Sequence, residues 1–280
     1  MHFTYPKISI VTPSFNSEDY LESTIQSVLR QTYPNLEYVI IDGGSTDRSV
    51  QIIKKYENEL AYWISEKDSG LYHALNKGFK QTSGEIMGWI NSDDMYHTNA
   101  FFTIAEIFSE YDEVKWLLGS CSAFDERGRT VNVRHSKEFT RDDFLKGDFK
   151  WIQQESCLWK RELWDKSGGA LNEQLKYAGD FELWMRFFRH EPLWVTNALI
   201  GGFRLRRSGQ LSSENYPEYL SEVEKTIRLE KSLPIKTKKR PRQGIRFDRK
   251  QQRFILTGKK GNLWRRSLVI GRKAWYRLFS

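Results

Sequence analysis

Short apolar runs alternate with amphipathic segments through the first hundred residues of the chain. Four apolar runs bounded by turn-forming residues are typical of strands: 7–12, 36–41, 61–65 and 86–90. The segments between them repeat apolar residues at helical spacing. They predict one helix over about 18–31, a second that begins at Thr46 or Asp47, and a third over 71–81. This alternation predicts an α/β fold with a doubly wound, mostly parallel sheet.

The second half of the chain is less regular. Helices are predicted over 100–110, over the segment GDFELWMRF with Asp180 at the helix start, and from about Asn215 to 231, before Pro234. Residues 236–280 predict a linker followed by an amphipathic helix over 263–279. Gly271 weakens the prediction of this helix. The alternative to a membrane-binding tail is a C-terminal helix that packs on the body. We therefore divide the chain into a domain of residues 1–235, with halves 1–97 and 98–235, and a basic amphipathic C-terminal tail, 236–280.

Polar loops follow each predicted strand, at 12–16, 42–47, 68–70 and 91–94. Because the carboxyl ends of parallel strands lie at one edge of a sheet, these loops should converge on one site. Asp93 and Asp94 directly follow the apolar run of GEIMGWINSDDMY, and paired carboxylates are suitable ligands for Mg²⁺ or Mn²⁺, which in turn hold phosphate oxygens. The alternative is a solvated turn leading to the next helix, because Asp is also favoured in turns and caps.

Composition narrows the class of protein. The 280 residues are 39% hydrophobic and 29% charged, and no apolar run approaches the ~20 residues that span a bilayer. The net charge of +8 is unevenly divided. Residues 236–280 hold 16 basic residues and one acidic residue, a net charge of +15. The first 235 residues hold 44−16 = 28 basic and 36−1 = 35 acidic residues, a net charge of −7. A mildly acidic body argues against a nucleic-acid-binding fold. No signal peptide is expected, and Cys121 and Cys157 fit no metal spacing.

Neither GxGxxG nor GxxxxGK[ST] follows a predicted strand, so no dinucleotide fingerprint or P-loop is predicted. The chain carries instead TPSFN, IDGGSTD, EKDSGLYHALNKG and GEIMGWINSDD in this order, followed by WIQQESCLW, LNEQLKYAGDFELWMRF and FRLRRSGQLSS. With this set of motifs it resembles the inverting family 2 glycosyltransferases of GT-A fold, over roughly residues 7–215. The resemblance implies a Rossmann-like nucleotide-binding half joined to an acceptor-binding half. The helical basic C-terminal extension lies outside the resemblance and is predicted from its own residues.

The resemblance implies a donor site built from all four loops: Thr12, Pro13, Ser14, Asn16, Asp42, Asp68, Gly70, Asn76, Lys77, Ser92 and Asp93. Asp42 would accept a hydrogen bond from the base, a contact that is strong where little water competes. The residues by themselves also allow plainer roles: a helix-starting turn for 12–16, a turn carboxylate for Asp42 and an exposed helical lysine for Lys77.

The resemblance also implies a metal site. Asn91-Ser92-Asp93 occupies the place of the DxD signature, so Asp93 matches the metal-binding carboxylate, with Asp94 as its neighbour. The ion, Mg²⁺ or Mn²⁺, would stabilise charge on the leaving diphosphate. Many relatives carry His where this chain has Arg206. Because arginine cannot coordinate a cation but can clamp phosphate oxygens, we predict Arg206, or its neighbour Arg207, as a phosphate ligand.

Asp180 is the candidate base, because the inverting relatives place an acidic residue here to deprotonate the acceptor hydroxyl. A plainer role is a helix cap worth ~1 kcal/mol. Gln154 and Trp184 are the predicted acceptor contacts.

We expect an inverting, metal-dependent transferase that moves a sugar, most simply from a UDP-sugar, to a saccharide or lipid-linked saccharide in cell-surface polysaccharide synthesis. It would be cytoplasmic and peripheral at the inner face of the cell membrane, with the tail on anionic lipid and no specific nucleic acid as partner. The alternatives are a sugar-nucleotide nucleotidyltransferase, which should carry a Gly-rich, basic loop after the first strand, and a non-catalytic membrane or RNA adaptor.

Overall fold

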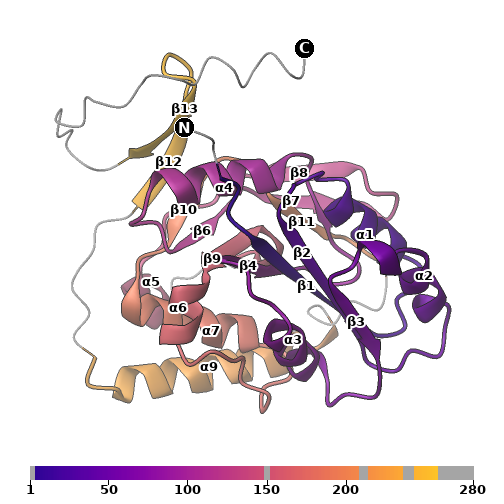
Figure 1. Ribbon diagram of the computed structural model, residues 1–280. Helices are drawn as coiled ribbons and strands as arrows, with labels where there is room; N and C mark the ends of the chain where they lie inside the picture. Colours follow the sequence, from indigo (N-terminus) through magenta and orange to yellow (C-terminus); the bar gives the residue numbers. More distant parts are fainter. Residues whose placement is uncertain (1–3, 148–151, 208–213, 236–242, 258–280) are drawn as a thin grey trace.

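The computed structural model describes residues 4–147, 152–207, 214–235 and 243–257. Within these residues a nine-stranded sheet has the order β13-β12-β10-β6-β9-β4-β1-β2-β3, with helices on both faces (Figure 1). Its strands are β1 (Ile8–Ser14), β2 (Leu36–Asp42), β3 (Tyr62–Ser65), β4 (Ile86–Trp89), β6 (Trp116–Leu118), β9 (Cys157–Lys160), β10 (Trp194–Thr196), β12 (Gln243–Asp248) and β13 (Arg253–Thr257).

The pairing of the strands confirms the predicted mostly parallel sheet. β1 is parallel to β2 and to β4, and β2 is parallel to β3, while β9 runs antiparallel to both β4 and β6. All seven residues of β1 are buried, as expected for a central strand with covered faces. The four strands predicted in the first hundred residues all form, with ends shifted by one or two residues.

Helices form a layer on each face of the sheet. Side chains of α1 (Leu21–Leu29), α2 (Ser49–Lys55) and α4 (Ala100–Glu110) pack with Ile8 and Ile10 of β1 in one cluster. The opposite cluster holds Val11 of β1 with α3 (Leu71–Lys80), α5 (Arg141–Leu145), α6 (Arg161–Lys166), α7 (Gly179–His190) and α9 (Tyr216–Ser232). Two 3-10 turns complete the set, η1 (Glu57–Glu59) and η2 (Gln154–Ser156).

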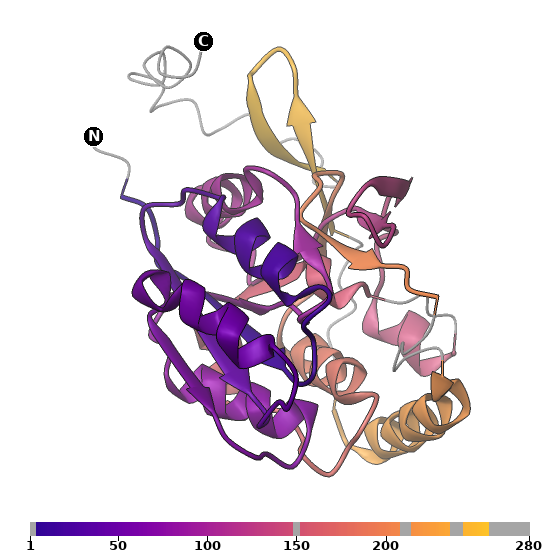
Figure 2. The same ribbon diagram turned by 90° about the vertical axis from the view of Figure 1, so that its right-hand side faces the viewer.

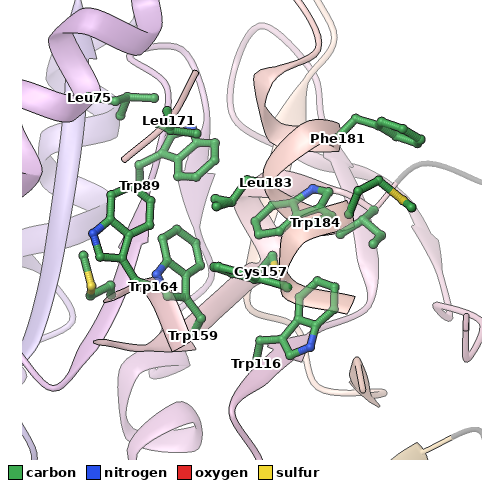
Figure 3. Packing of buried hydrophobic residues seen from close by; sticks show 14 of the residues in the cluster. Leu75, Trp89, Trp116, Cys157, Trp159, Trp164, Leu171, Phe181, Leu183 and Trp184 are labelled. Carbon is green, nitrogen blue, oxygen red and sulfur yellow. The ribbon is translucent and has the colours of Figure 1, made fainter. Parts of the chain in front are cut away.

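Tryptophan rings fix α7 against the sheet (Figure 3). Trp184 of α7 is stacked on Trp89 of β4, with ring centroids 5.9 Å apart, and on Trp116 of β6 at 5.6 Å. Each such pair contributes about 0.5–1.5 kcal/mol beyond the area that it buries. Trp184 is only 1% exposed, so its ring belongs to the core, where it sets the position of the helix, and its contact with an acceptor stays a prediction.

A second, four-stranded sheet was not predicted. Its order is β5-β11-β7-β8, and its strands are β5 (Met95–Tyr96), β7 (Cys121–Phe124), β8 (Thr130–Arg134) and β11 (Gly201–Arg204). Gly201 of β11 packs so closely on the backbone of Glu155 that a Cβ atom would overlap the Glu155 carbonyl. This close approach brings the end of β11 to the loop after β4.

Part of the predicted C-terminal tail belongs to the fold. β12 pairs in parallel with β10, β13 pairs with β12, and the hairpin projects from the end of the sheet (Figure 2). Ile245 is buried, and the hydroxyl of Tyr111 donates to the carbonyl of Phe254 at 2.7 Å. Residues 243–257 of the predicted tail therefore add two strands to the sheet, and the predicted boundary at 235 stays a prediction. The helix predicted over 263–279 lies outside the described residues, and none of the described helices is long and apolar enough to cross a membrane.

Candidate active site

The loops after β1, β2 and β4 are joined by hydrogen bonds. The backbone N–H of Asn16 donates to Ser45 Oγ at 2.8 Å, and Asn16 Oδ1 accepts the N–H of Thr46 at 2.9 Å. Asn16 adopts φ 45°, a left-handed conformation that Asn tolerates better than most residues. Ser17 Oγ lies 2.7 Å from Ser92 Oγ in the loop after β4. The predicted convergence of these loops at the carboxyl edge is therefore present.

Asp42 organises the loop that follows β2. Its buried carboxylate accepts the N–H groups of Gly44 at 3.1 Å and Ser45 at 2.9 Å. The hydroxyls of Ser45, at 2.5 Å, and Ser65, at 2.7 Å, donate to it as well. Both carboxylate oxygens are thus engaged, and the predicted contact with a base would come in addition to this role in shaping the loop.

Asp68 lies beside the same loop. Its Oδ1 accepts the N–H of Gly70 at 2.8 Å, and a Cβ atom on Gly43 would come within 2.8 Å of its Oδ2. Gly70 has φ 116°, a conformation that glycine adopts without strain and L side chains rarely reach. Two glycines therefore allow Asp68 to approach the end of β2.

The TPSFN segment presents a different surface from the predicted one. Thr12, Pro13 and Ser14 are buried, and Thr12 Oγ1 lies 3.0 Å from the hydroxyl of Tyr38. Phe15, in contrast, is 63% exposed at the rim of the converging loops. Sequence reasoning missed this ring, although an aromatic residue inside a polar loop was a usable signal.

Asn76 and Lys77 have partners away from the loops after β1 and β4. The amide of Asn76 donates to the Leu171 carbonyl at 2.9 Å and to Glu173 at 2.7 Å, and it accepts the Leu171 N–H at 2.8 Å. Lys77 Nζ forms an ion pair with Glu66 at 2.5 Å. In this structure Asn76 therefore joins α3 to the segment before α7, and its contact with the donor stays a prediction.

Asp93 is paired with the predicted phosphate ligand. Its Oδ2 lies 3.2 Å from Nε of Arg206, and the Asp93 side chain remains 21% exposed. Burial raises the pKa of the Asp93 carboxyl, and the positive charge of Arg206 opposes that rise. The Arg206 guanidinium also lies over the ring of Tyr20, 5.8 Å from its centroid. Arg206 is therefore placed at the carboxylate to which a metal-bound diphosphate would come.

Arg204, which sequence reasoning missed, supports this loop from behind. Its buried guanidinium donates to the Asp93 carbonyl at 2.5 Å, to Ser23 Oγ at 2.8 Å and to carbonyls in the turn between β7 and β8. Its backbone N–H donates to Asp94 Oδ1 at 2.8 Å. Arg204 is buried at the end of the unpredicted second sheet, and its motif, FRLRRSGQLSS, did not indicate which of its arginines is buried.

Asp94 faces a second buried carboxyl. Its side chain is 1% exposed, and its carboxyl interacts with the carboxyl of Glu155 in η2. Burial raises the pKa of Asp94 well above its usual value, with the charge of Asp93 adding to the rise, and it raises the pKa of Glu155 to about 7. A shared proton between the two carboxyls explains both directions. The role of Asp94 as a neighbour of Asp93 in the metal site stays a prediction, and in the structure its carboxyl accepts the backbone N–H of Arg204.

Asp180 is the second residue of α7, after the N-cap residue Ala178. Its Oδ1 is buried and accepts no hydrogen bond from the described residues. Burial raises the pKa of this carboxyl to about 6, the N–H of Phe181 opposes the rise, and the charge of Glu222 adds to it. Asp93 and Asp180 both raise the pKa of Glu155 through their charges, so the carboxyls form one acidic centre around Glu155.

Buried oxygens without a donor are concentrated at this acidic centre. Gln154 donates to the Trp89 carbonyl at 2.6 Å, but its Oε1 lacks a donor within the described part of the chain. The same holds for Oδ1 of Asn91 and Oδ1 of Asp180. Leaving a buried polar group unsatisfied costs about 1–3 kcal/mol, so such a concentration is typical of a site completed by a ligand.

The residues present fit a cation held together with a nucleotide. The described ranges contain no group of three or more His, Cys, Asp or Glu side chains placed to hold a metal by themselves. Mg²⁺ at nucleotide sites needs only one or two carboxylates, because phosphate oxygens and waters supply the other ligands. Asp93 is the accessible carboxylate that meets this requirement, and in the structure its partner is Arg206.

Comparison with known proteins agrees with the fold and with the motifs. A family model described as Glycosyl transferase family 2 matches residues 9–166, more than half of the chain. An uncharacterized glycosyltransferase of Rickettsia typhi is 30% identical over 202 residues, 70% of this chain and 63% of that protein. TuaG of Bacillus subtilis, whose description assigns it to teichuronic acid biosynthesis, is 36% identical over 145 residues, 50% of this chain and 58% of that protein.

Solved structures show the same architecture. S. aureus TarS 1–349 in complex with UDP-GlcNAc has a TM-score of 0.64 and 24% identity, covering 80% of this chain and 66% of that chain. A longer TarS structure gives a TM-score of 0.62 at 24% identity, with 80% and 39% coverage. The chain thus spans 63% of the Rickettsia typhi relative and 39% of TarS, and the likeness to TarS shows the GT-A fold. On the family match, this chain belongs to glycosyl transferase family 2.

Proposed function

We propose that this protein is an inverting glycosyltransferase that moves a sugar from a UDP-sugar to a hydroxyl of a saccharide or lipid-linked saccharide during cell-surface polysaccharide synthesis. Membership of family 2 supports the reaction class. The UDP-GlcNAc complex of TarS supports a UDP-sugar donor, and the description of TuaG supports the polysaccharide. The observation that carries the proposal is the buried carboxyl of Asp180, whose Oδ1 accepts no hydrogen bond from the described residues. The Asp93–Arg206 pair supports it at the end of β4.

The donor would lie across the converging loops. The exposed ring of Phe15 offers a face on which a base can stack, and Asp42 holds the neighbouring loop in shape. Arg206 would turn its guanidinium from Asp93 to the diphosphate, a bidentate contact for which arginine is well suited. Asp93 would hold Mg²⁺ or Mn²⁺, and the ion would supply stabilisation of the charge that develops on the leaving diphosphate.

Asp180 would act as the base. With a pKa raised to about 6, its carboxyl is mostly ionised at neutral pH yet binds a proton more readily than an exposed aspartate. The acceptor oxygen forms a bond to the anomeric carbon as the bond from that carbon to the diphosphate oxygen breaks. The acceptor proton passes to Asp180, and the electron pair of the broken bond leaves with UDP. Attack opposite the leaving group inverts the anomeric carbon.

The protein would work on the cytoplasmic side of the cell membrane, bound peripherally to anionic lipid through its C-terminal residues. Residues 236–280 carry a net charge of +15, and each basic residue near such a surface contributes about 1 kcal/mol. In the described part of this segment, Arg246, Arg249 and Lys250 are exposed on the hairpin, together with Phe247. Attachment here would bring the active site to a lipid-linked acceptor.

A donor screen tests the proposed function. Release of the nucleotide is measured for a panel of UDP-, GDP- and dTDP-sugars, with and without saccharide acceptors, in Mg²⁺, Mn²⁺ and EDTA. We expect acceptor-dependent UDP release that EDTA suppresses. Release of pyrophosphate from UTP and a sugar phosphate would identify a nucleotidyltransferase instead. A correctly folded protein that binds no sugar nucleotide would favour an adaptor.

A further inference from the structure

The segment that leads into α7 is held from both sides. On one side, α3 contributes Asn76, which bonds Leu171 at both its N–H and its carbonyl, and Tyr72, whose buried hydroxyl accepts the Gly179 N–H at 2.8 Å. The Tyr72 ring lies so close to Gly179 that a Cβ atom there would come within 2.6 Å of it. The backbone just before Asp180 is therefore fixed against α3.

On the other side, a single carboxylate of α9 holds three consecutive peptides. Glu222 accepts the N–H groups of Lys176 at 3.0 Å, Tyr177 at 3.0 Å and Ala178 at 2.8 Å. These are the residues immediately before Gly179, the first residue of α7. Tyr177 is also bonded through its hydroxyl to Asn215 at 3.2 Å. Because charge-assisted hydrogen bonds are short and strong, this contact orders the start of α7.

We infer that Glu222 is a positioning residue for Asp180: its carboxylate holds the three peptides at the entry to α7 and so fixes where the Asp180 side chain begins. The inference rests on the proposed function only for the use that is made of Asp180 as a base. Glu222 lies beyond residues 9–166, the part matched by the family model, and none of the sequence motifs included it.

The electrostatic surroundings of Asp180 support this assignment. The titratable groups that interact with Asp180 come from four elements: Tyr72 of α3, Glu155 of η2, Cys157 of β9, and Tyr219 and Glu222 of α9. Burial is the main cause of the raised Asp180 pKa, and Glu222 is the charged neighbour that adds to it. Removing that charge should therefore lower the pKa of Asp180, whereas shortening the side chain should mainly release the backbone.

Two substitutions separate charge from reach. Glu222→Gln keeps the length of the side chain and removes the charge, while Glu222→Asp keeps the charge and is one methylene too short to reach all three N–H groups. Glu224→Gln is the matched control, because Glu224 is exposed on the same helix and its ion pair is with Arg228, at 3.9 Å. Asp180→Asn identifies the Asp180 signal in a ¹³C-carboxyl NMR titration of aspartate-labelled protein.

We expect the Asp180 midpoint, about 6 in the unmodified protein, to fall by roughly half a unit to one unit in Glu222→Gln and to stay near 6 in Glu222→Asp and Glu224→Gln. Hydrogen exchange of the amides of residues 176–178 should accelerate in Glu222→Asp and remain slow in the control. Exchange of these amides that stays slow in Glu222→Asp would overturn the inference.

The unmodified protein provides a test that does not depend on how the variants fold. Its amides at 176–178 should exchange as slowly as those of the first turn of α7, and exchange at the rate of an open loop would contradict the contact with Glu222. Neither measurement uses a donor sugar. Failure of the donor screen with both results intact would therefore refute the proposed reaction and leave the role of Glu222 standing.

Discussion

The two sides of the active site satisfy their polar groups in opposite ways. On the nucleotide side, Asn16, Asp42 and Asp68 are engaged by hydrogen bonds within and between the loops. On the catalytic side, buried oxygens of Asn91, Gln154 and Asp180 have no donor within the described residues. The first side is complete without a ligand, and the second is not.

This difference indicates how the work is divided. Loops that hold their own shape lose little conformational entropy when a nucleotide binds, so they favour affinity. A buried centre with several carboxyls and unsatisfied oxygens costs stability in the free protein and becomes favourable only with a cation, a hydroxyl or a proton in place. Substitutions on the two sides should therefore affect different measurements.

The largest effect is expected from Asp180→Asn. Removing the base should lower kcat by about 10²–10⁴-fold and leave UDP affinity, measured by calorimetry, unchanged. In the unmodified enzyme kcat should rise with pH through about 6, because the base must be ionised. Asp142→Asn is the control, since Asp142 is the second residue of α5 and is exposed. Transfer by Asp180→Asn within a few-fold of the unmodified enzyme would mean that Asp180 is not the base.

Asp93→Ala should lower metal-stimulated turnover by about 10²–10³-fold, because a charge-stabilising contact to the leaving group is lost. EDTA should then have little further effect on the variant, while it strongly inhibits the unmodified enzyme. Asp19→Ala removes an exposed carboxylate near the same loops and serves as the control. Full activity of the unmodified enzyme in EDTA would contradict a metal at Asp93.

Asp42→Ala should weaken UDP binding by roughly 10–100-fold, the equivalent of losing hydrogen bonds to a charged group. The loss arises because Gly44, Ser45 and Ser65 lose their acceptor, so the loop no longer holds its shape. Asp68→Ala, which removes a carboxylate bonded to Gly70, should weaken binding less. An Asp42→Ala protein with normal UDP affinity would show that the nucleotide side is not organised by Asp42.

Glu155→Gln should change how stability depends on pH. The pKa of Glu155 is about 7 in the fold against an ordinary value of 4.5, so the native state binds the extra proton between these values and loses stability as pH rises through them. At about 1.4 kcal/mol per pKa unit, the loss is about 3 kcal/mol. In the variant an N–H replaces the shared proton, so thermal midpoints at pH 5 and pH 8 should converge. An unchanged difference between them would argue against the carboxyl pair.

Removal of residues 258–280 should have the smallest effect on either side of the site. UDP affinity and turnover with a soluble acceptor should stay the same, while co-sedimentation with anionic vesicles should fall, because basic residues are lost. The truncated chain must end after Thr257, since β12 and β13 belong to the sheet. Equal partition of both proteins onto the vesicles would contradict the proposed attachment.

Local patterns predicted the elements whose signal lies within a short stretch of sequence. The four strands of the first half and the helix over 100–110 formed where apolar spacing placed them. The hairpin of 243–257 was mistaken for part of a tail, because Arg246, Arg249 and Arg253 dominate its composition. Its apolar alternation, Ile245 and Phe247 against Phe254 and Leu256, was visible but was outweighed by the charge.

The site was predicted less evenly, because some roles depend on contacts far apart in the chain. The loops converged as the strand order requires, which a local reading can anticipate. Asn76 bonds a segment 95 residues away, and Glu155 is paired with Asp94 through η2, so neither role is visible in a motif. The second sheet, which carries Arg204, has short strands whose pairing depends on the rest of the fold.

The anomeric configuration of the first product tests the central claim most directly. With a donor identified in the screen, for example the α-linked UDP-GlcNAc, the product is analysed by ¹H NMR before it can mutarotate. Direct attack by an acceptor hydroxyl that Asp180 deprotonates gives a β-linked product. An α-linked product would contradict single-step inversion and with it the role that we assign to Asp180.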